Sequence, residues 1–411
     1  MKKESPNYKW MVVGLLWFVG LLNYLDRQML STMKPSMEID IAELQSAENF
    51  GILMSVFLWI YGLMSPVSGV IADKVNRKWL IVLSLFIWSF VTLLMGYADS
   101  FETLKWLRGI MGFSEAVYIP AALSLIADYH HSKTRSLAIG IHMTGLYMGQ
   151  ALGGFGAAIA NEYSWHQTFI GFGLIGIVYA VILIVFLREK RSAVDLQQEK
   201  ITGEKKHVFS GVLWLLSTVS FWVMLLYFAI PSLPGWATKN WLPTLFAQSL
   251  DIDMAVAGPM ATIAIASSSL FGVIIGGLIS DRWVQKNMRA RIYTSAIGVF
   301  LTIPAIVMLG FGNTAFVLTL AAVLFGFGFG MFDANNMPIL CQFVPPKYRA
   351  TGYGLMNMTG VFFGAFITSF LGKSTDAGNL GRDFALMSGV VLLVLIVQLL
   401  VLRPRHHDMQ A

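Results

Sequence analysis

The sequence has little charge and almost no cysteine. Only 13% of its 411 residues are charged, against about a quarter in a typical soluble protein. This composition excludes a soluble globule, a disordered chain and a fibrous repeat. The single cysteine, Cys341, cannot form an internal disulfide, which excludes a small disulfide-stapled fold. In place of charge the chain has 56% hydrophobic residues, about as many as twelve membrane-spanning helices of roughly 20 residues need.

Motifs for catalysis and metal binding are also missing. The sequence contains no Ser/His/Asp arrangement, no metal-spaced Cys/His group and no phosphate-cradling glycine loop in a suitable context. The glycine run at 326–330 lacks the strand and helix that a nucleotide loop requires. A soluble nucleotide-binding domain is absent as well. We therefore expect neither an enzyme nor a primary pump, and no cofactor or bound metal.

Twelve apolar stretches are predicted to cross a membrane as helices. They lie near residues 9–32, 49–72, 79–98, 102–128, 136–160, 167–187, 210–248, 256–280, 291–311, 314–343, 352–372 and 384–402. The longest polar segment, 188–209, separates six spans from the other six. We predict an N-terminal bundle at 1–187, a cytoplasmic linker at 188–209 and a C-terminal bundle at 210–411.

The basic residues predict the orientation in the membrane. With a cytoplasmic N-terminus, 22 of the 29 Lys and Arg residues fall in the tails, linker and loops of the cytoplasmic side. The positive-inside rule therefore places both termini in the cytoplasm. Because the basic residues are dispersed over every inner loop, the net charge of +6 does not indicate nucleic-acid binding.

Two short motifs occur at corresponding places in both halves. Gly-Val-Ile-Ala-Asp-Lys at 69–74 matches Gly-Leu-Ile-Ser-Asp-Arg at 277–282, and Lys-Thr-Arg at 133–135 matches Lys-Tyr-Arg at 347–349. Such duplication is typical of transporters that rock about a site near the bilayer midplane. The Gly-x-x-x-Asp-[Lys/Arg] loop resembles the signature of the major facilitator superfamily. The resemblance implies an all-α membrane protein, with twelve transmembrane helices in two pseudo-symmetric six-helix bundles, the major facilitator fold.

Charged residues of these inner loops are predicted to form a latch that holds one conformation without touching substrate. The gating set is Asp73, Lys74, Arg77, Asp128 and Arg135 in the first half, with Asp281, Arg282 and Arg349 as a weaker counterpart in the second half.

Five ionisable residues are expected inside the membrane: Asp26, Arg27, Arg108, Glu115 and Asp333. A charge at the bilayer centre costs a few kcal/mol, so these residues should face the bundle interior and be paired. Arg108 and Glu115 are seven residues apart, which puts them on one helix face but about 10 Å apart along the axis. In one arrangement Asp26 meets Arg108 while Arg27 faces the cavity. Salt bridges that only join helices are the alternative.

Glu115 is our first choice for a group that takes up and releases a proton, because its stretch is apolar and its own helix supplies no second base. An arginine, which keeps its proton, suits a carboxylate substrate.

The surroundings of these charges resemble the anion:cation symporter family within the superfamily. The matching stretches are Asn-Tyr-Leu-Asp-Arg at 23–27, Phe-x-Trp-x-Tyr at 57–61 and Glu-Ala-x-x-x-Pro-Ala-Ala at 115–122. The match is good over 20–175 and loose in the second half. Ser65 occupies a position where the family often has glutamine. This difference affects the expected pocket, so it leaves open which sugar acid is bound.

The resemblance implies proton-coupled transport of a small organic anion, a monocarboxylate sugar acid such as a hexuronate or aldonate. It also implies a monomer in the bacterial inner membrane, with substrate, protons and the lipid bilayer as its partners. Asp26 and Glu115 would couple protons, and Arg27 would anchor the substrate. Tyr24 and Tyr61 would line the cavity, and Arg108 would pair with a carboxylate.

Further substrate contacts are predicted at polar positions of the second half and of span 5: Gln150, Trp241, Asp333, Asn336 and Asn357. Trp241 belongs to a Trp-Leu-Pro stretch similar to the family's. For the other four, polar contacts between helices are an equally good interpretation. Asp333 is the main unexplained charge.

Pro231, Pro234 and Gly235 are predicted to interrupt the seventh span. The interruption would form an outer gate, with Lys239 at its mouth.

Other functions stay open. A lysolipid carrier like the spinster group also has an Asn-Tyr-x-Asp-Arg stretch and a Glu-Ala pair, and an exporter of an amphipathic drug or peptide fragment is a second alternative. A non-transporting sensor or scaffold fits the repeated halves poorly. A groove open to lipid would favour the lipid carrier, whereas an enclosed polar pocket around Arg27 would favour the sugar acid.

Overall fold

The computed structural model describes residues 7–130, 132–190, 208–345 and 348–403, with the backbone alone at 69–70, 72–74, 132–133, 136, 208–211 and 350. All regular elements in these ranges are helices. The N-terminal half contains α1 (Tyr8–Asp40), the short 3-10 helix η1 (Ala42–Gln45), α2 (Ala47–Lys74), α3 (Arg77–Met95), α4 (Phe101–Glu115), α5 (Tyr118–Tyr129), α6 (Ser132–Gly153), α7 (Gly156–Tyr163) and α8 (Trp165–Phe186). The C-terminal half contains α10 (Val208–Leu216), α11 (Val219–Leu250), α12 (Met254–Trp283), α13 (Ala290–Phe311), α14 (Ala315–Asp333), α15 (Asn336–Phe343), α16 (Arg349–Asp376) and α17 (Leu380–Val401).

The helices confirm the predicted all-α membrane fold. In the described part of the chain, eleven helical segments are long and apolar enough to cross a membrane. They coincide with eleven of the predicted spans. The stretch predicted at 136–160 is occupied by α6 and α7, which are richer in glycine and polar residues than the other spans.

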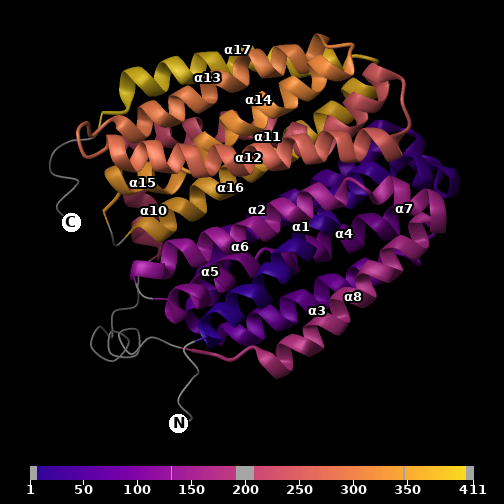
Figure 1. Ribbon diagram of the computed structural model, residues 1–411, viewed down its shortest axis with the longest axis horizontal. Coiled ribbons are helices and arrows are strands. Elements are labelled where there is room, and N and C mark those ends of the chain that lie inside the picture. Colours follow the sequence, from indigo (N-terminus) through magenta and orange to yellow (C-terminus); the bar gives the residue numbers. More distant parts are fainter. Residues whose placement is uncertain (1–6, 131, 191–207, 346–347, 404–411) are drawn as a thin grey trace.

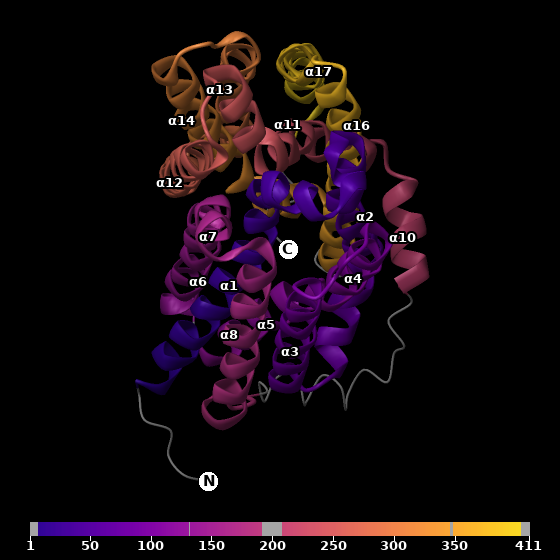
Figure 2. The same cartoon turned by 90° about the vertical axis from the view of Figure 1, so that its right-hand side faces the viewer.

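The two halves form separate bundles that lie side by side, with the first half in indigo to magenta and the second in pink to yellow (Figure 1). The start of α1 and the end of α17 lie at the same end of the molecule, here called the termini end. Viewed along the bundles, α16 lies beside α2, and α12 lies beside α6 and α7 (Figure 2). These are the most extensive contacts between the halves, and α1 also contacts α11 and α12.

At the end opposite the termini, a side chain from one half caps a helix of the other. The Asp376 carboxylate, at the end of α16, accepts hydrogen bonds from the backbone nitrogens of Ala47 (2.7 Å) and Glu48 (2.9 Å) and from the Ser46 hydroxyl (2.8 Å). Lys373 also pairs with Glu48 at 3.1 Å. A carboxylate is favourable at a helix N-terminus, where backbone N–H groups are unpaired. The first turn of α2, which Ser46 also caps from within its own half, therefore gains stability when the halves are together at this end.

The repeat found in the sequence has the same local structure in both halves. Arg135 donates from Nε to the carbonyl of His130, at the end of α5, at 3.3 Å, and Arg349 donates from Nε to the carbonyl of Val344, at the end of α15, at 3.1 Å. Each arginine thus satisfies a carbonyl that a helix end leaves unpaired.

The residues predicted to form a latch contact partners within their own halves. Arg77 pairs with Asp128, and Asp281 lies 3.7 Å from Arg291. Arg282 is exposed. The side chains of Asp73 and Lys74 lie outside the described residues, so the latch remains a prediction.

The predicted break in span 7 is wrong. Helix α11 continues from Val219 to Leu250 with Pro231, Pro234 and Pro243 inside it. A proline removes one backbone hydrogen bond, but a membrane offers no water to compete for the remaining ones. Neighbouring helices also support this segment, since Gly235 abuts the Phe329 ring. The interruption falls earlier, between α10 and α11.

Three glycines at four-residue intervals on α6, Gly145, Gly149 and Gly153, let this helix approach the backbone of α1. A Cβ at Gly149 would lie only 2.1 Å from the carbonyl oxygen of Leu21. Small residues at this spacing are the usual basis of close packing between membrane helices. Because α1 carries three residues of the site described below, the glycines also set the position of the site.

We predict that Gly149→Ala destabilises the protein by about 1–3 kcal/mol, because the added methyl group pushes α6 away from α1. The measurement is the thermal unfolding midpoint of the detergent-purified protein. Gly140→Ala is the matched control on the same helix, since no atom lies within 4 Å of its Cβ position. Equal midpoints for the two variants would contradict the prediction.

Candidate substrate and proton site

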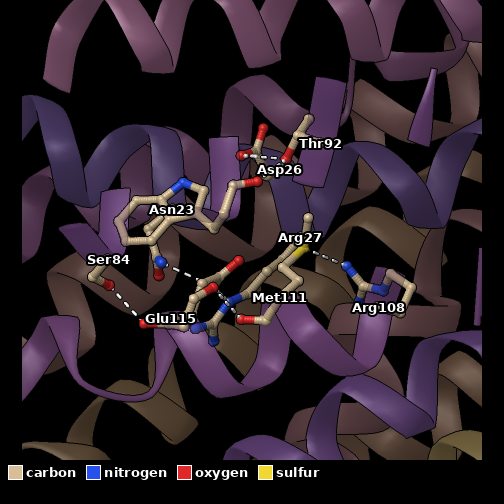
Figure 3. Close-up of polar contacts among 10 residues, drawn as sticks. Asn23, Asp26, Arg27, Ser84, Thr92, Arg108, Met111 and Glu115 are labelled. Atoms are coloured by element: carbon tan, nitrogen blue, oxygen red, sulfur yellow. Dashed lines mark hydrogen bonds and ion pairs between the residues drawn. The ribbon is translucent and has the colours of Figure 1, made fainter. Parts of the chain in front are cut away.

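Five polar residues of α1 and α4 gather inside the N-terminal half and are here called the charge cluster: Asn23, Asp26, Arg27, Arg108 and Glu115 (Figure 3). At its centre, the Arg27 Nε donates to Glu115 Oε2 at 2.6 Å. The amide of Asn23 donates to the same oxygen at 2.9 Å. Glu115 is completely buried, so these two donors take the place of water around its charge.

The local structure of both helices explains this pairing. Asn23 and Arg27 are four residues apart on α1, so they project from the same face, one turn apart. Glu115 is the last residue of α4, immediately before the chain turns into α5. The Ser84 hydroxyl of α3 donates to the carbonyl of Ser114 at 2.6 Å and holds this turn in place (Figure 3).

Aromatic rings surround the Arg27 guanidinium. Its Cζ lies 5.2 Å from the ring centre of Tyr24, 4.7 Å from that of Phe57 and 4.8 Å from that of Tyr61. Such contacts stabilise a cation that has lost its water. Among the described residues, Nη2 of Arg27 has no hydrogen-bond partner. The guanidinium therefore keeps donors for a ligand while Glu115 occupies Nε.

The expected contact between Asp26 and Arg108 is not formed. Asp26 accepts a hydrogen bond from the Thr92 hydroxyl at 3.3 Å, and Arg108 donates to the sulfur of Met111 at 3.2 Å (Figure 3). The Arg108 guanidinium also lies over the Phe57 ring at 4.6 Å. Within the ranges described, no carboxylate pairs with Arg108. The expectation was wrong because Arg27, rather than Arg108, turns toward a carboxylate.

A central cavity lies between the two halves, next to the charge cluster. It is lined by residues of α1, α6, α11, α12 and α14: Tyr24, Met143, Leu146, Tyr147, Gln150, Gly235, Thr238, Lys239, Ile265, Ser269, Phe325, Phe329 and Asp333. A smaller adjoining pocket has a lining of Tyr24, Arg27, Gln28, Gln150, Trp236, Lys239 and Asn240. Of the predicted substrate residues, Tyr24, Gln150 and Asp333 thus line the central cavity, and Arg27 lines the adjoining pocket. Their contact with substrate remains a prediction.

Other predicted substrate residues lie outside these two linings. Trp241 donates from its indole to the carbonyl of Thr368 at 2.9 Å, and Asn357 donates to the Ser65 hydroxyl at 2.6 Å. Both contacts join helices, which was the alternative interpretation for Asn357. Tyr61 and Arg108 remain in the charge cluster region without reaching the cavity wall.

Asn336 supports Asp333 from outside the cavity. Its amide donates to Asp333 Oδ1 at 3.1 Å, and its oxygen accepts from the Tyr227 hydroxyl at 3.0 Å. Asp333 is the last residue of α14, as Glu115 is of α4. Each half therefore presents a carboxylate at the interruption of its fourth span.

Lys239 is the residue whose place sequence reasoning missed. We expected it at the mouth of an outer gate, but it lines both cavities. Its Nζ lies 4.7 Å from the ring centre of Trp236 and 5.8 Å from that of Tyr24. The sequence did contain a signal for this position. Lys239 lies inside an apolar stretch that is long enough for one continuous helix, provided that the helix contains the prolines.

Two repeated helical bundles around a charged cavity define a multi-pass membrane transporter, not an enzyme. The chain belongs to the Major Facilitator Superfamily, whose family model matches residues 16–369. This confirms the family expected from the repeated loop motif.

Relatives and solved structures agree with this assignment. A probable galactarate/D-glucarate transporter, GarP of Escherichia coli K12, is 27% identical over 395 residues, covering 87% of this chain and 86% of that protein. Spinster homolog 1 of Xenopus tropicalis is 27% identical over 385 residues, covering 86% of this chain and 70% of that protein. The crystal structure of a bacterial homolog of the human lysosomal transporter Spinster, inward-facing and unoccupied, has a TM-score of 0.82 at 20% identity, covering 99% of this chain and 100% of that one. At that identity the likeness shows the fold alone.

The pairing within the charge cluster predicts a strong energetic coupling. We expect Arg27→Met and Glu115→Gln each to lower the free energy of unfolding by about 3–5 kcal/mol, because each leaves a buried group without its partner. The double variant should lose less than the two single losses together. The measurement is unfolding of the purified protein in detergent. The control combines Arg27→Met with Glu162→Gln, which lies at an exposed site, and the two losses of unfolding free energy should add. Additive losses for Arg27→Met and Glu115→Gln would contradict the pairing.

Proposed function

We propose that this chain is a proton-coupled symporter of a small sugar acid, located in the bacterial inner membrane with both termini cytoplasmic. The observation that carries the proposal is the contact between Arg27 and Glu115. It places an arginine with unused donors at a cavity wall, and joins it to a buried carboxyl that can take up a proton.

Competition for Arg27 supplies the coupling. While Glu115 is ionised, it holds the Nε of Arg27 and the amide of Asn23. Protonation removes its negative charge, weakens this hold and frees the guanidinium for a substrate carboxylate. Proton and substrate thereby favour each other's binding, which is the condition for coupled transport. Asp26, whose side chain accepts a hydrogen bond from Thr92 alone among the described residues, is a second proton site.

The charge balance of the cluster fits this sequence of events. Two carboxyl groups, Asp26 and Glu115, stand near two guanidinium groups, Arg27 and Arg108. Each proton adds one positive charge, and each substrate carboxylate removes one. With one proton for each carboxylate, the loaded carrier keeps the charge of the empty one, which avoids moving extra charge through the low-dielectric membrane interior.

The polar side chains in the cavity wall favour a sugar acid over a lipid. Hydroxyl, amide and charged groups from both halves face the space beside Arg27, and such groups bind the hydroxyls of a sugar chain. The similarity to named galactarate/D-glucarate transporters supports the same substrate class. A spinster-like lysolipid carrier is the second candidate, since spinster proteins are among the relatives; the charged and amide side chains that line the pocket beside Arg27 argue against it.

The test is uptake into proteoliposomes. We expect labelled galactarate or a hexuronate to accumulate faster when the outside is acidic, and we expect Glu115→Gln to abolish this acceleration while exchange across the membrane continues. Glu162→Gln is the matched control and should behave like the unaltered protein. Uptake that ignores the proton gradient, or a Glu115→Gln variant that still responds to it, would exclude the proposed coupling.

A further inference from the structure

Two cations from different halves lie near one tyrosine ring. The ring centre of Tyr24 is 5.2 Å from Cζ of Arg27 on α1 and 5.8 Å from Nζ of Lys239 on α11. The two charges are therefore no more than about 11 Å apart. Gln28, one residue after Arg27, donates from Nε2 to the backbone carbonyl of Lys239 at 2.9 Å. This bond fixes α11 against α1 at the level of the cavity.

The Lys239 ammonium faces the cavity without an ion-pair partner. No carboxylate lies within 4.0 Å of its Nζ in the described part of the chain. Asp333 lines the same cavity, but its Oδ1 is held by Asn336. The rings of Trp236 and Phe329, at 4.7 and 6.0 Å, only partly replace the missing water. An unpaired ammonium inside a membrane protein is costly, and an anionic ligand group would offset that cost.

We propose that Lys239 determines substrate specificity by binding a second carboxylate, so that the substrate is a dicarboxylate sugar acid spanning the two halves. This inference rests on the proposed function and revises the monocarboxylate expected from the sequence. Arg27 holds one end of the substrate, and Lys239 holds the other.

The separation limits the conformation of the bound acid. An extended six-carbon diacid with a hydrogen bond of about 2.8 Å at each end is longer than the distance of at most about 11 Å between Arg27 and Lys239. The substrate therefore has to bind with its carbon chain bent. A monocarboxylate of the same length would leave one of the two cations unpaired.

The experiment compares two acids that differ only at one end: galactarate, with two carboxylates, and galactonate, in which one carboxylate is replaced by a CH2OH group. Each is tested as an inhibitor of labelled galactarate uptake into proteoliposomes. We expect the unaltered carrier to bind galactarate at least about tenfold more tightly, as one charge-assisted contact is worth that much. In Lys239→Gln the affinity for galactarate should fall about tenfold, with the affinity for galactonate changed less than about twofold.

Two variants keep the test selective. Lys239→Arg retains the charge and should recover most of the preference for galactarate. Lys286→Gln, at an exposed position on the termini side of the molecule, should change neither affinity. Unchanged galactonate binding in Lys239→Gln also shows that the variant is folded. Equal loss for both acids in Lys239→Gln, or no preference in the unaltered protein, would overturn the inference.

A binding measurement separates this inference from the proposed function. Galactarate should raise the unfolding temperature of the detergent-purified protein more than galactonate does, and Lys239→Gln should remove the difference. If this difference is observed but uptake does not depend on the proton gradient, the proposed coupling is wrong and the dicarboxylate site is supported. If uptake is proton-driven but Lys239→Gln leaves the preference intact, the symporter stands and the role of Lys239 fails. If neither acid binds, both proposals are overturned.

Discussion

The buried ion pair between Arg27 and Glu115 is the interaction on which the rest of the site depends. Moving both charges out of water costs several kcal/mol each, and the pair alone regains this only with good geometry and additional hydrogen bonds. The protein provides those with the Asn23 amide and with the aromatic rings around the guanidinium. Such a pair is expensive as a means of joining helices, but in the proposed mechanism it makes Glu115 and a substrate carboxylate compete for one arginine.

The scaffold positions this pair through contacts that need no charge. Gly145, Gly149 and Gly153 bring α6 onto α1 and so set where Asn23 and Arg27 stand. At the end opposite the termini, Asp376 caps α2 across the boundary between the halves. Such a bond breaks if the halves separate there, so the same contact that joins the halves also depends on their relative orientation.

The cavity belongs to both halves, and its chemistry cannot be derived from either alone. The N-terminal half brings Arg27 and Tyr24, and the C-terminal half brings Lys239 and Asp333. A ligand held by both halves changes its contacts whenever the halves rock against each other. Its affinity therefore differs between the two conformations, and this difference shifts the equilibrium between them. If Lys239 has the role proposed above, the number of cations that face the cavity decides how many carboxylates the ligand carries.

The sequence alone predicted twelve spans, eleven of which coincide with long apolar helices, and it also predicted the repeat and most of the buried charges. It could do so because a bilayer imposes length and apolarity on each span separately. It also indicated Tyr24, Arg27, Gln150 and Asp333 as cavity residues. Only the tertiary structure decided that Arg27 pairs with Glu115, that Asp26 does not meet Arg108, and that Lys239 faces the cavity. Those facts depend on how helices distant in the chain are rotated and placed against one another, and a pattern read along one chain does not encode the relative rotation of two helices.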